Sequence, residues 1–278
     1  MLGSIEQGAK ITDVAQISER SATTQISFKD KDITAPALLK GKNVGSWGFG
    51  NEWELFAGMQ KSGVRVGDIK LVQQSFDMNG FLSGDIAAAQ AMTYNEYAQV
   101  LETQNPKPGE LYQPSDLNVI HWNDEGTAML QDGIWADADK LASDRDYAAN
   151  TVKFIKASIK GWIYAATNPD KAAGIVTAAG SQLPAGHQLW MTNEVNKLIW
   201  TSMNGVGLID AAAWKNIVEI AMNTKNETGA TIITAEPPKT AYSNEYVQKA
   251  LDELTRDGVD VIGADWKPIT VTLGEGGE

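Results

Sequence analysis

Apolar and polar positions follow the short spacing of β-strands in the first part of the chain. Each of these runs sets isoleucine, valine or another apolar residue among polar neighbours and ends in polar residues. Such runs of four to eight residues, bounded by polar or glycine-containing turns, predict strands. We expect strands at residues 11–17, 24–28, 43–47, 69–74 and 117–122, and a further one that ends at Met92. A short helix is expected at 34–40, where threonine and proline stand at helix-opening positions.

From about residue 126 onward the spacing changes to that of helices. Val152, Ile155, Ile159 and Ile163 fall on one face of a helix predicted at 146–166. Further helices are expected at 169–179, after Asp210 and after Ser243, and residues 128–135 are expected to return to the first domain as a strand. Strands that alternate with helices predict an α/β fold.

Residues 43–61 form the clearest candidate for a ligand site. The pattern predicts a strand, a Gly-Phe-Gly turn and a helix that Asn51 caps, with Gly50 permitting a positive φ in the turn. In α/β proteins the carboxyl ends of strands hold small ligands. Glu52 already supplies a carboxylate to the positive end of the helix, which disfavours phosphate and favours a ligand with N–H groups. The alternative is an ordinary turn with an acid near the helix cap.

A second strand-to-helix transition repeats this arrangement at Tyr94, Asn95 and Glu96. If both strands belong to one parallel sheet, Glu52 and Glu96 come to the same edge. Aromatic rings would stack on a flat solute, and the carboxylates would accept its N–H groups. The alternative for the aromatic residues is packing in the core. The candidate ligand-binding residues are Trp47, Phe49, Gly50, Asn51, Glu52, Phe76, Tyr94, Asn95, Glu96 and Trp122.

Composition excludes several classes of function. Lys+Arg 23 against Asp+Glu 35 gives a net charge of −12, which disfavours nucleic acid as a partner. The 278-residue chain contains no cysteine and two histidines, His121 and His187, far apart in sequence. We therefore expect no metal site, no cofactor and no catalytic residues. No signal peptide pattern opens the chain, and no apolar run has the length of a membrane span.

Several motifs together resemble the solute-binding proteins of nitrate/taurine-type ABC importers, and most of all the branch that binds thiamine-precursor pyrimidines. They span most of the chain: residues 14–21 (VAQISERS), 39–45 (LKGKNVG), 48–52 (GFGNE), 82–86 (LSGDI), 92–96 (MTYNE), 161–164 (GWIY) with Asn168 and Pro169, and 204–210 (NGVGLID).

The resemblance implies a type II periplasmic-binding-protein fold, with two lobes, a hinge and a ligand between the lobes. It also implies a small nitrogen-containing solute, pyrimidine-like or amine-bearing, a membrane permease as partner, and a periplasmic or cell-surface location. The expected division is residues 1–41 for part of lobe 1, 42–126 for lobe 2, and 127–278 for the remainder of lobe 1.

The match begins only near residue 7, so the family's first two βα units are expected to be missing and the first lobe to be incomplete. An exposed sheet edge of that kind would favour pairing with a second copy. A sensor or interaction module is therefore a second hypothesis. An enzyme of pyrimidine biosynthesis is a third and weaker one, because the cysteine-rich motif of such relatives has no counterpart here.

Overall fold

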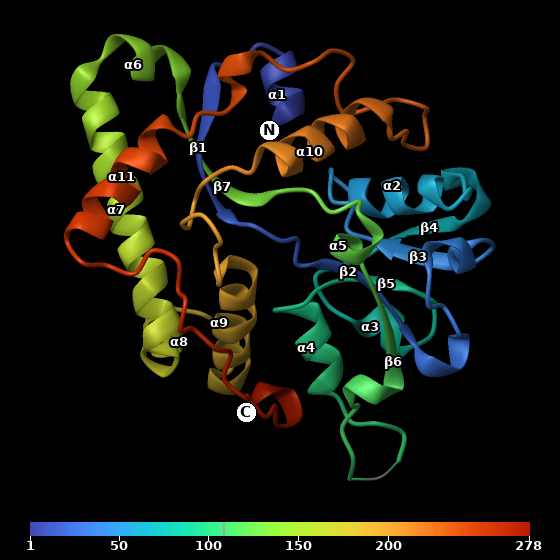
Figure 1. The fold of residues 1–278 in the computed structure, drawn as a ribbon. Coiled ribbons are helices and arrows are strands. Elements are labelled where there is room, and N and C mark those ends of the chain that lie inside the picture. Colours follow the sequence, from blue (N-terminus) through green and yellow to red (C-terminus); the bar gives the residue numbers. More distant parts are fainter. Residues whose placement is uncertain (108) are drawn as a thin grey trace.

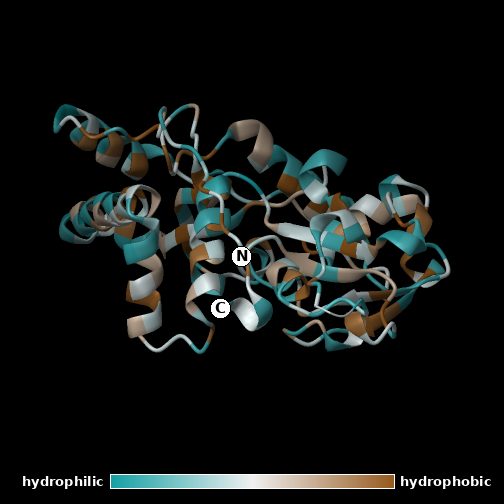
Figure 2. Ribbon diagram, turned by 90° about the horizontal axis from the view of Figure 1, so that it is seen from below, coloured by the Kyte–Doolittle hydropathy of each residue, from teal (hydrophilic) through white to brown (hydrophobic). Residues whose placement is uncertain are grey.

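The computed structural model describes residues 1–107 and 109–278, which form two parts around separate groups of strands (Figure 1). We call residues 23–126 the sheet part, and residues 1–18 together with 131–278 the helical part. The segments 19–22 and 127–130 cross between them. No helix in the described residues is long and apolar enough to cross a membrane, and Figure 2 shows hydrophilic residues interspersed along the helices.

The described residues of the sheet part form five strands. β2 (Thr23–Phe28) pairs antiparallel with β5 (Ala89–Met92) on one side and with β6 (Leu117–His121) on the other. β3 (Asn43–Ser46) pairs in parallel with β4 (Lys70–Gln73), and a parallel bridge from Val44 to Ala88 sets β3 beside β5. The sheet is therefore mixed, because β2 runs against its neighbours. β3, β4 and β5 still share one direction.

Each helix of the sheet part follows a strand along the chain. They are α2 (Trp53–Lys61), α3 (Asn79–Leu82), α4 (Glu96–Leu101) and α5 (Trp122–Glu125). The predicted face of α2 is confirmed: Leu55, Phe56 and Met59 are fully buried in one core with Val44. Asn51 does not cap this helix. Its side-chain amide instead donates to the Gly48 carbonyl at 2.9 Å, within the turn.

Residues 23–41 pack with the sheet part. β2 lies at the centre of its strands, and Ile33 and Leu39 belong to the same core as Val44 and Leu55. The boundary expected after residue 41 differs from this packing, because the central strand of the sheet comes from before that boundary.

The helical part is organised on one antiparallel pair, β1 (Ile11–Ser18) with β7 (Gln131–Asp137). Its helices are α1 (Leu2–Glu6), α6 (Ala138–Ser143), α7 (Arg145–Thr167), α8 (Pro169–Ala178), α9 (Ala185–Ile199), α10 (Ala211–Asn223) and α11 (Glu245–Arg256). Val14 and Ile17 of β1 pack with Ile155, Ile159 and Leu251 in its main core. Figure 1 shows α7 and α11 side by side at the outer face, in agreement with this core.

Helix α9 also contacts the sheet part. Nδ1 of the buried His187 lies 2.8 Å from a carboxylate oxygen of Glu102, and its Nε2 lies 3.1 Å from Oδ1 of Asn95. The indole N–H of Trp190 donates to the Thr93 carbonyl at 3.0 Å. The two parts are therefore joined both by the crossing segments and by a buried polar contact between α9 and α4.

Close packing of Trp122 under α2 gives a test of the core. Trp122 is fully buried, and a Cβ added at Gly58 would lie 2.5 Å from its ring. We expect Gly58→Ala to lower the free energy of unfolding by about 1–3 kcal/mol, as overpacked cores do. Chemical denaturation measures this. The matched control is Gly161→Ala within α7, where a Cβ meets nothing within 4 Å, and it should add about 0.5–1 kcal/mol. Equal stability of both variants would contradict the packing.

Candidate functional site

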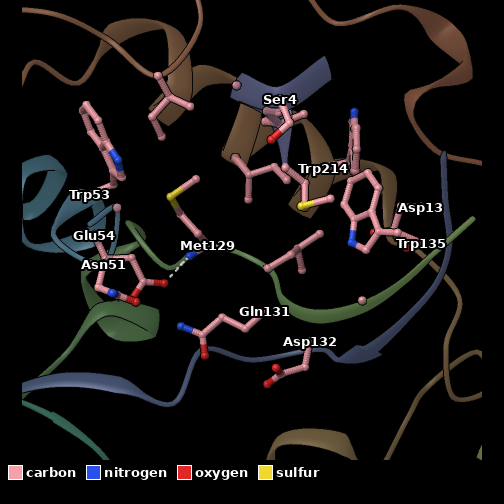
Figure 3. Close-up of a pocket in the computed structure, with 18 of the residues that line it drawn as sticks. Ser4, Asp13, Asn51, Trp53, Glu54, Met129, Gln131, Asp132, Trp135 and Trp214 are labelled. Atoms are coloured by element: carbon pink, nitrogen blue, oxygen red, sulfur yellow. Dashed lines mark hydrogen bonds between the residues drawn. The ribbon is translucent and has the colours of Figure 1, made fainter. Parts of the chain in front are cut away.

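A cavity of about 730 Å³ lies between the two parts, lined by α1, β1, β7 and α10 on one side and by the β3–α2 turn on the other. Figure 3 shows its labelled residues around the open space, with Met129 and Gln131 on the segment that enters β7. Tryptophan side chains supply much of the apolar wall: Trp53 from α2, Trp135 from β7 and Trp214 from α10. Such a mixture of rings and a few polar groups is typical of small-molecule sites.

Three carboxylates line this cavity, those of Asp13, Glu54 and Asp132, while no lysine, arginine or histidine side chain is among its described lining residues. Asp13 is 1% exposed, and burial raises the pKa of its carboxyl group to about 7. Asp132 is more accessible, and its partial burial also raises its pKa. Low surrounding polarity disfavours a charged carboxylate. The cavity is therefore suited to a solute that brings positive charge or N–H groups.

Glu54 fastens both crossing segments to the start of α2. Its Oε2 accepts the hydroxyl of Ser21 at 2.9 Å, and its Oε1 accepts the backbone N–H of Met129 at 2.5 Å. The latter bond is drawn as a dashed line in Figure 3. Burial raises the pKa of Glu54 to about 7, although these hydrogen bonds favour its charged form. Both oxygens are thus occupied by the protein, so Glu54 positions the cavity wall.

Gln131 makes further hydrogen bonds to the first crossing segment. Its side-chain amide donates to the hydroxyl groups of Ser21 and Thr23, and its carbonyl accepts the backbone N–H of Ala22 at 3.1 Å. Together with Glu54, it holds the first crossing segment against the start of β7. The rim of the cavity therefore includes the junction between the two parts.

The turn between β3 and α2 presents an aromatic side chain at the cavity. Phe49 is 97% exposed, and its backbone has a φ of 56°, between glycines at 72° and 99°. A left-handed phenylalanine is uncommon and persists where its surroundings enforce it. Two side-chain amides hold the turn: the exposed Gln73 donates to the Trp47 carbonyl, and the buried Gln90 donates to the Asn51 carbonyl.

Three of the predicted site residues line the cavity: Phe49, Gly50 and Asn51. Glu52 lies beside them but is used within the turn, where its carboxylate accepts the Gly50 backbone N–H at 3.0 Å. Its role in binding remains a prediction. Glu52 occupies the residue just before α2, close to the helix start where the sequence pattern predicts it.

Trp47 and Phe76 lie together outside the cavity lining. Their rings stack with centroids 6.2 Å apart and 17° between planes, with Trp47 buried and Phe76 75% exposed. The predicted ligand contact does not fit Trp122, which is fully buried beneath α2. A tryptophan that follows a strand is compatible with both outcomes, and in the structure Trp122 is the first residue of α5 and packs under α2.

Tyr94, Asn95 and Glu96 also lie outside the cavity lining. The buried Glu96 carboxylate accepts the backbone N–H of Met92 and the side-chain amide of Asn95, both at 3.0 Å. These bonds brace the start of α4. Burial, and then the negative charges of Asp132 and Glu96, raises the pKa of Tyr94 to about 12. Tyr94 therefore stays a protonated phenol.

Sequence reasoning missed Asp13, Glu54, Gln131 and Asp132. A usable signal was present for two of them. Asp13 stands within a predicted strand, and Glu54 stands directly before Leu55 on the buried face of α2. An acid at a core position is costly unless it is paired or serves a site. Asp132 and Gln131 carry no comparable local signal.

The buried carboxyl group of Asp13 gives a pH-dependent prediction. Its folded pKa is raised above the unfolded value of 3.8, so the folded state binds more protons, and its contribution to stability is lost as pH rises toward 7. Asp13→Asn lacks this loss. Its free energy of unfolding, taken relative to wild type, should therefore be about 2 kcal/mol higher at pH 8 than at pH 5. Denaturant unfolding at both pH values measures this. Because burial also raises the pKa of Glu54 to about 7, the stability of the variant should keep some pH dependence. Asp257→Asn, at an exposed position, is the control. An unchanged difference between the two pH values would contradict burial as the cause.

Comparison with known proteins places the chain in a family. The family model described as "NMT1/THI5 like" matches residues 1–172, which is more than half of the chain. A search of curated proteins found no match.

Solved structures share the fold at low identity. A putative sulfonate ABC transporter periplasmic sulfonate-binding protein, SsuA from Methylobacillus flagellatus KT, gives a TM-score of 0.61 at 17% identity, covering 98% of this chain and 76% of that one. A protein from Bordetella bronchiseptica RB50 gives 0.58 at 16%, covering 91% and 78%. The desulfurization enzyme DSZB gives 0.55 at 11%, covering 91% and 83%. The predicted α/β fold is confirmed. The chain belongs to the NMT1/THI5-like family and has the α/β fold of periplasmic solute-binding proteins.

Proposed function

We propose that this protein is the substrate-binding component of an ABC importer and that it captures a small nitrogen-containing solute, pyrimidine-like or amine-bearing, between two lobes. The observation that carries this proposal is the cavity between the two parts, which combines three carboxylates and three tryptophans with no basic side chain among its described lining residues. The family match and the shared fold support a binding role.

The acidic lining of the cavity distinguishes the proposed solute from the sulfonate that is named for one structural neighbour. The Methylobacillus flagellatus protein is named as sulfonate-binding, and a sulfonate is an anion. An anion 4 Å from one carboxylate would meet a repulsion on the order of 4 kcal/mol at the effective dielectric of a protein surface. An ammonium or protonated ring would gain a comparable attraction. We therefore propose a neutral donor-rich or cationic solute and not a sulfonate.

The proposed lobes are the sheet part and the helical part, and closure of these lobes over the solute would complete capture. We propose that Phe49, Gly50 and Asn51 contact the solute from one lobe, while Trp135 and Trp214 contact it from the other. A permease in the membrane would receive the solute, with the protein in the periplasm or at the cell surface. We propose binding and not catalysis, because the family match and the fold shared with a sulfonate-binding protein support a binding role.

Thermal unfolding with a panel of solutes tests this function. The panel is 4-aminopyrimidine, thiamine, spermidine, riboflavin and ethanesulfonate, an anion without an amine. A bound solute at a hundred times its dissociation constant adds about 2.7 kcal/mol of stability, which raises the melting temperature. We expect this shift with at least one amine or pyrimidine and none with ethanesulfonate. A shift with ethanesulfonate alone would overturn the proposed class, and no shift with any member would overturn the binding function.

Phe49 provides a matched test of the site. Because its ring is exposed in the free protein, Phe49→Ala should leave stability within about 0.5 kcal/mol. It should weaken binding of an aromatic solute about 2-fold to 10-fold, since stacking contributes about 0.5–1.5 kcal/mol. Isothermal titration measures the affinity. Phe76→Ala, also exposed but outside the cavity lining, is the control. Equal effects of both substitutions would remove Phe49 from the site.

A further inference from the structure

Three oxygen atoms converge above Gly133 at one end of the cavity. The position that a Cβ on Gly133 would occupy lies 2.9 Å and 3.1 Å from the two carboxylate oxygens of Asp13, and 3.1 Å from Oε1 of Gln16. All three residues line the cavity. Glycine lets the three oxygens approach the backbone closely, and a side chain at residue 133 would displace them.

A bulge in β1 brings Asp13 and Gln16 together. In a regular strand, residues three apart point to opposite faces of the sheet. The register of β1 against β7 shifts between Asp13 and Ala15, so that Asp13 pairs with Trp135 while Gln16 pairs with Gly133. An extra residue of this kind redirects side chains and is common beside functional sites.

These oxygens have few donors within the protein. Among the described residues, the Asp13 carboxylate accepts only the backbone N–H of Ala15, at 3.3 Å. Gln16 uses its amide N–H groups, which donate to the carbonyls of Ser18 and Gln131, and this fixes its Oε1 toward Gly133. Both side chains are at least 97% buried, since 1% and 3% of their surfaces are exposed. Because Asp13 and Gln16 line the cavity, these oxygens are accessible to a donor that enters it.

The chemistry of the three oxygens selects the donor. A carboxylate and an amide carbonyl accept hydrogen bonds and donate none, which matches a primary ammonium group with three N–H donors and one positive charge. A hydroxyl group supplies one donor and no charge. Calcium requires six to eight oxygen ligands, more than these two side chains offer, and the described residues contain no cluster of three acidic or metal-binding side chains.

We propose that Asp13 and Gln16, converging above Gly133, hold the primary ammonium group of the captured solute. This inference rests on the proposed binding function and specifies its solute class. Asp13 pairs with Trp135 across the strands, and paired residues share one face of a sheet, so an aromatic body next to the ammonium group would lie against that ring. Figure 3 shows Asp13 and Trp135 together at the end of the cavity away from Glu54.

A pair of probes with the same ring tests the ammonium subsite. Benzylamine carries the ammonium group, and benzyl alcohol replaces it with a neutral hydroxyl group. Titration calorimetry of the wild-type protein at pH 8 should show benzylamine binding at least 10-fold more tightly than benzyl alcohol. Asp13→Asn should abolish this preference while preserving the size of the side chain. Equal affinity for both probes, or no binding of benzylamine, would overturn the inference.

A second variant keeps the test valid if Asp13→Asn does not fold. Gly133→Ala places a Cβ within 3.1 Å of all three oxygens and should weaken benzylamine at least 10-fold while leaving benzyl alcohol nearly unchanged. Gly174→Ala in α8, where a Cβ meets nothing within 4 Å, should bind both probes like wild type. Circular dichroism verifies that each variant is folded.

The outcomes separate this subsite from the wider function. If solutes of the panel stabilise the wild-type protein and both Asp13→Asn and Gly133→Ala leave every affinity unchanged, the binding function stands and the ammonium subsite is wrong. If no member of the panel and neither probe binds, both are wrong.

Discussion

The pairing of β1 with β7 is the constraint on which the rest of the molecule depends. β1 leads into the first crossing segment, and β7 follows the second, so this one ladder fixes where both connections between the two parts run. Glu54 then ties both connections to α2 through Ser21 and Met129. Because the cavity is lined by β1, β7 and the start of α2, the position of its walls follows from this ladder and this carboxylate.

The cavity concentrates acidic side chains, and no basic side chain among its described lining residues pairs with them. Burial raises the pKa of Asp13 and of Glu54 to about 7 in each case, so each carboxyl group is disfavoured in its charged form. Proteins accept such local cost at functional sites, where a ligand can offset it. The two acids serve different purposes. Glu54 has both oxygens bonded within the chain, whereas Asp13 has one weak internal donor among the described residues. We therefore assign Glu54 to positioning the cavity wall and propose Asp13 as the acid that binds the solute.

Aromatic residues show a similar division between structure and site. Trp122 fills the space under α2, and Trp47 lies against Phe76, while Trp53, Trp135 and Trp214 line the cavity. Phe49 is held in a left-handed conformation by a turn whose carbonyls are bonded by Gln73 and Gln90. An exposed ring in a fixed turn is ready to bury its surface against a solute, which costs little ordering entropy on binding.

Local pattern by itself determined most strands, the buried face of α2 and the change from strands to helices near residue 126, because these depend on hydrophobic spacing within one segment. It also identified the turn that carries Phe49, Gly50 and Asn51. Only the tertiary structure decided that β2 runs antiparallel in the centre of the sheet, that Trp122 is closed off by α2, and that Asp13, Glu54 and Asp132 meet at one cavity. Those outcomes depend on contacts between residues far apart in the chain. The bulge in β1, the crossing segments and the packing of α2 over Trp122 do not change the hydrophobic spacing within one segment, so the sequence pattern does not reveal them.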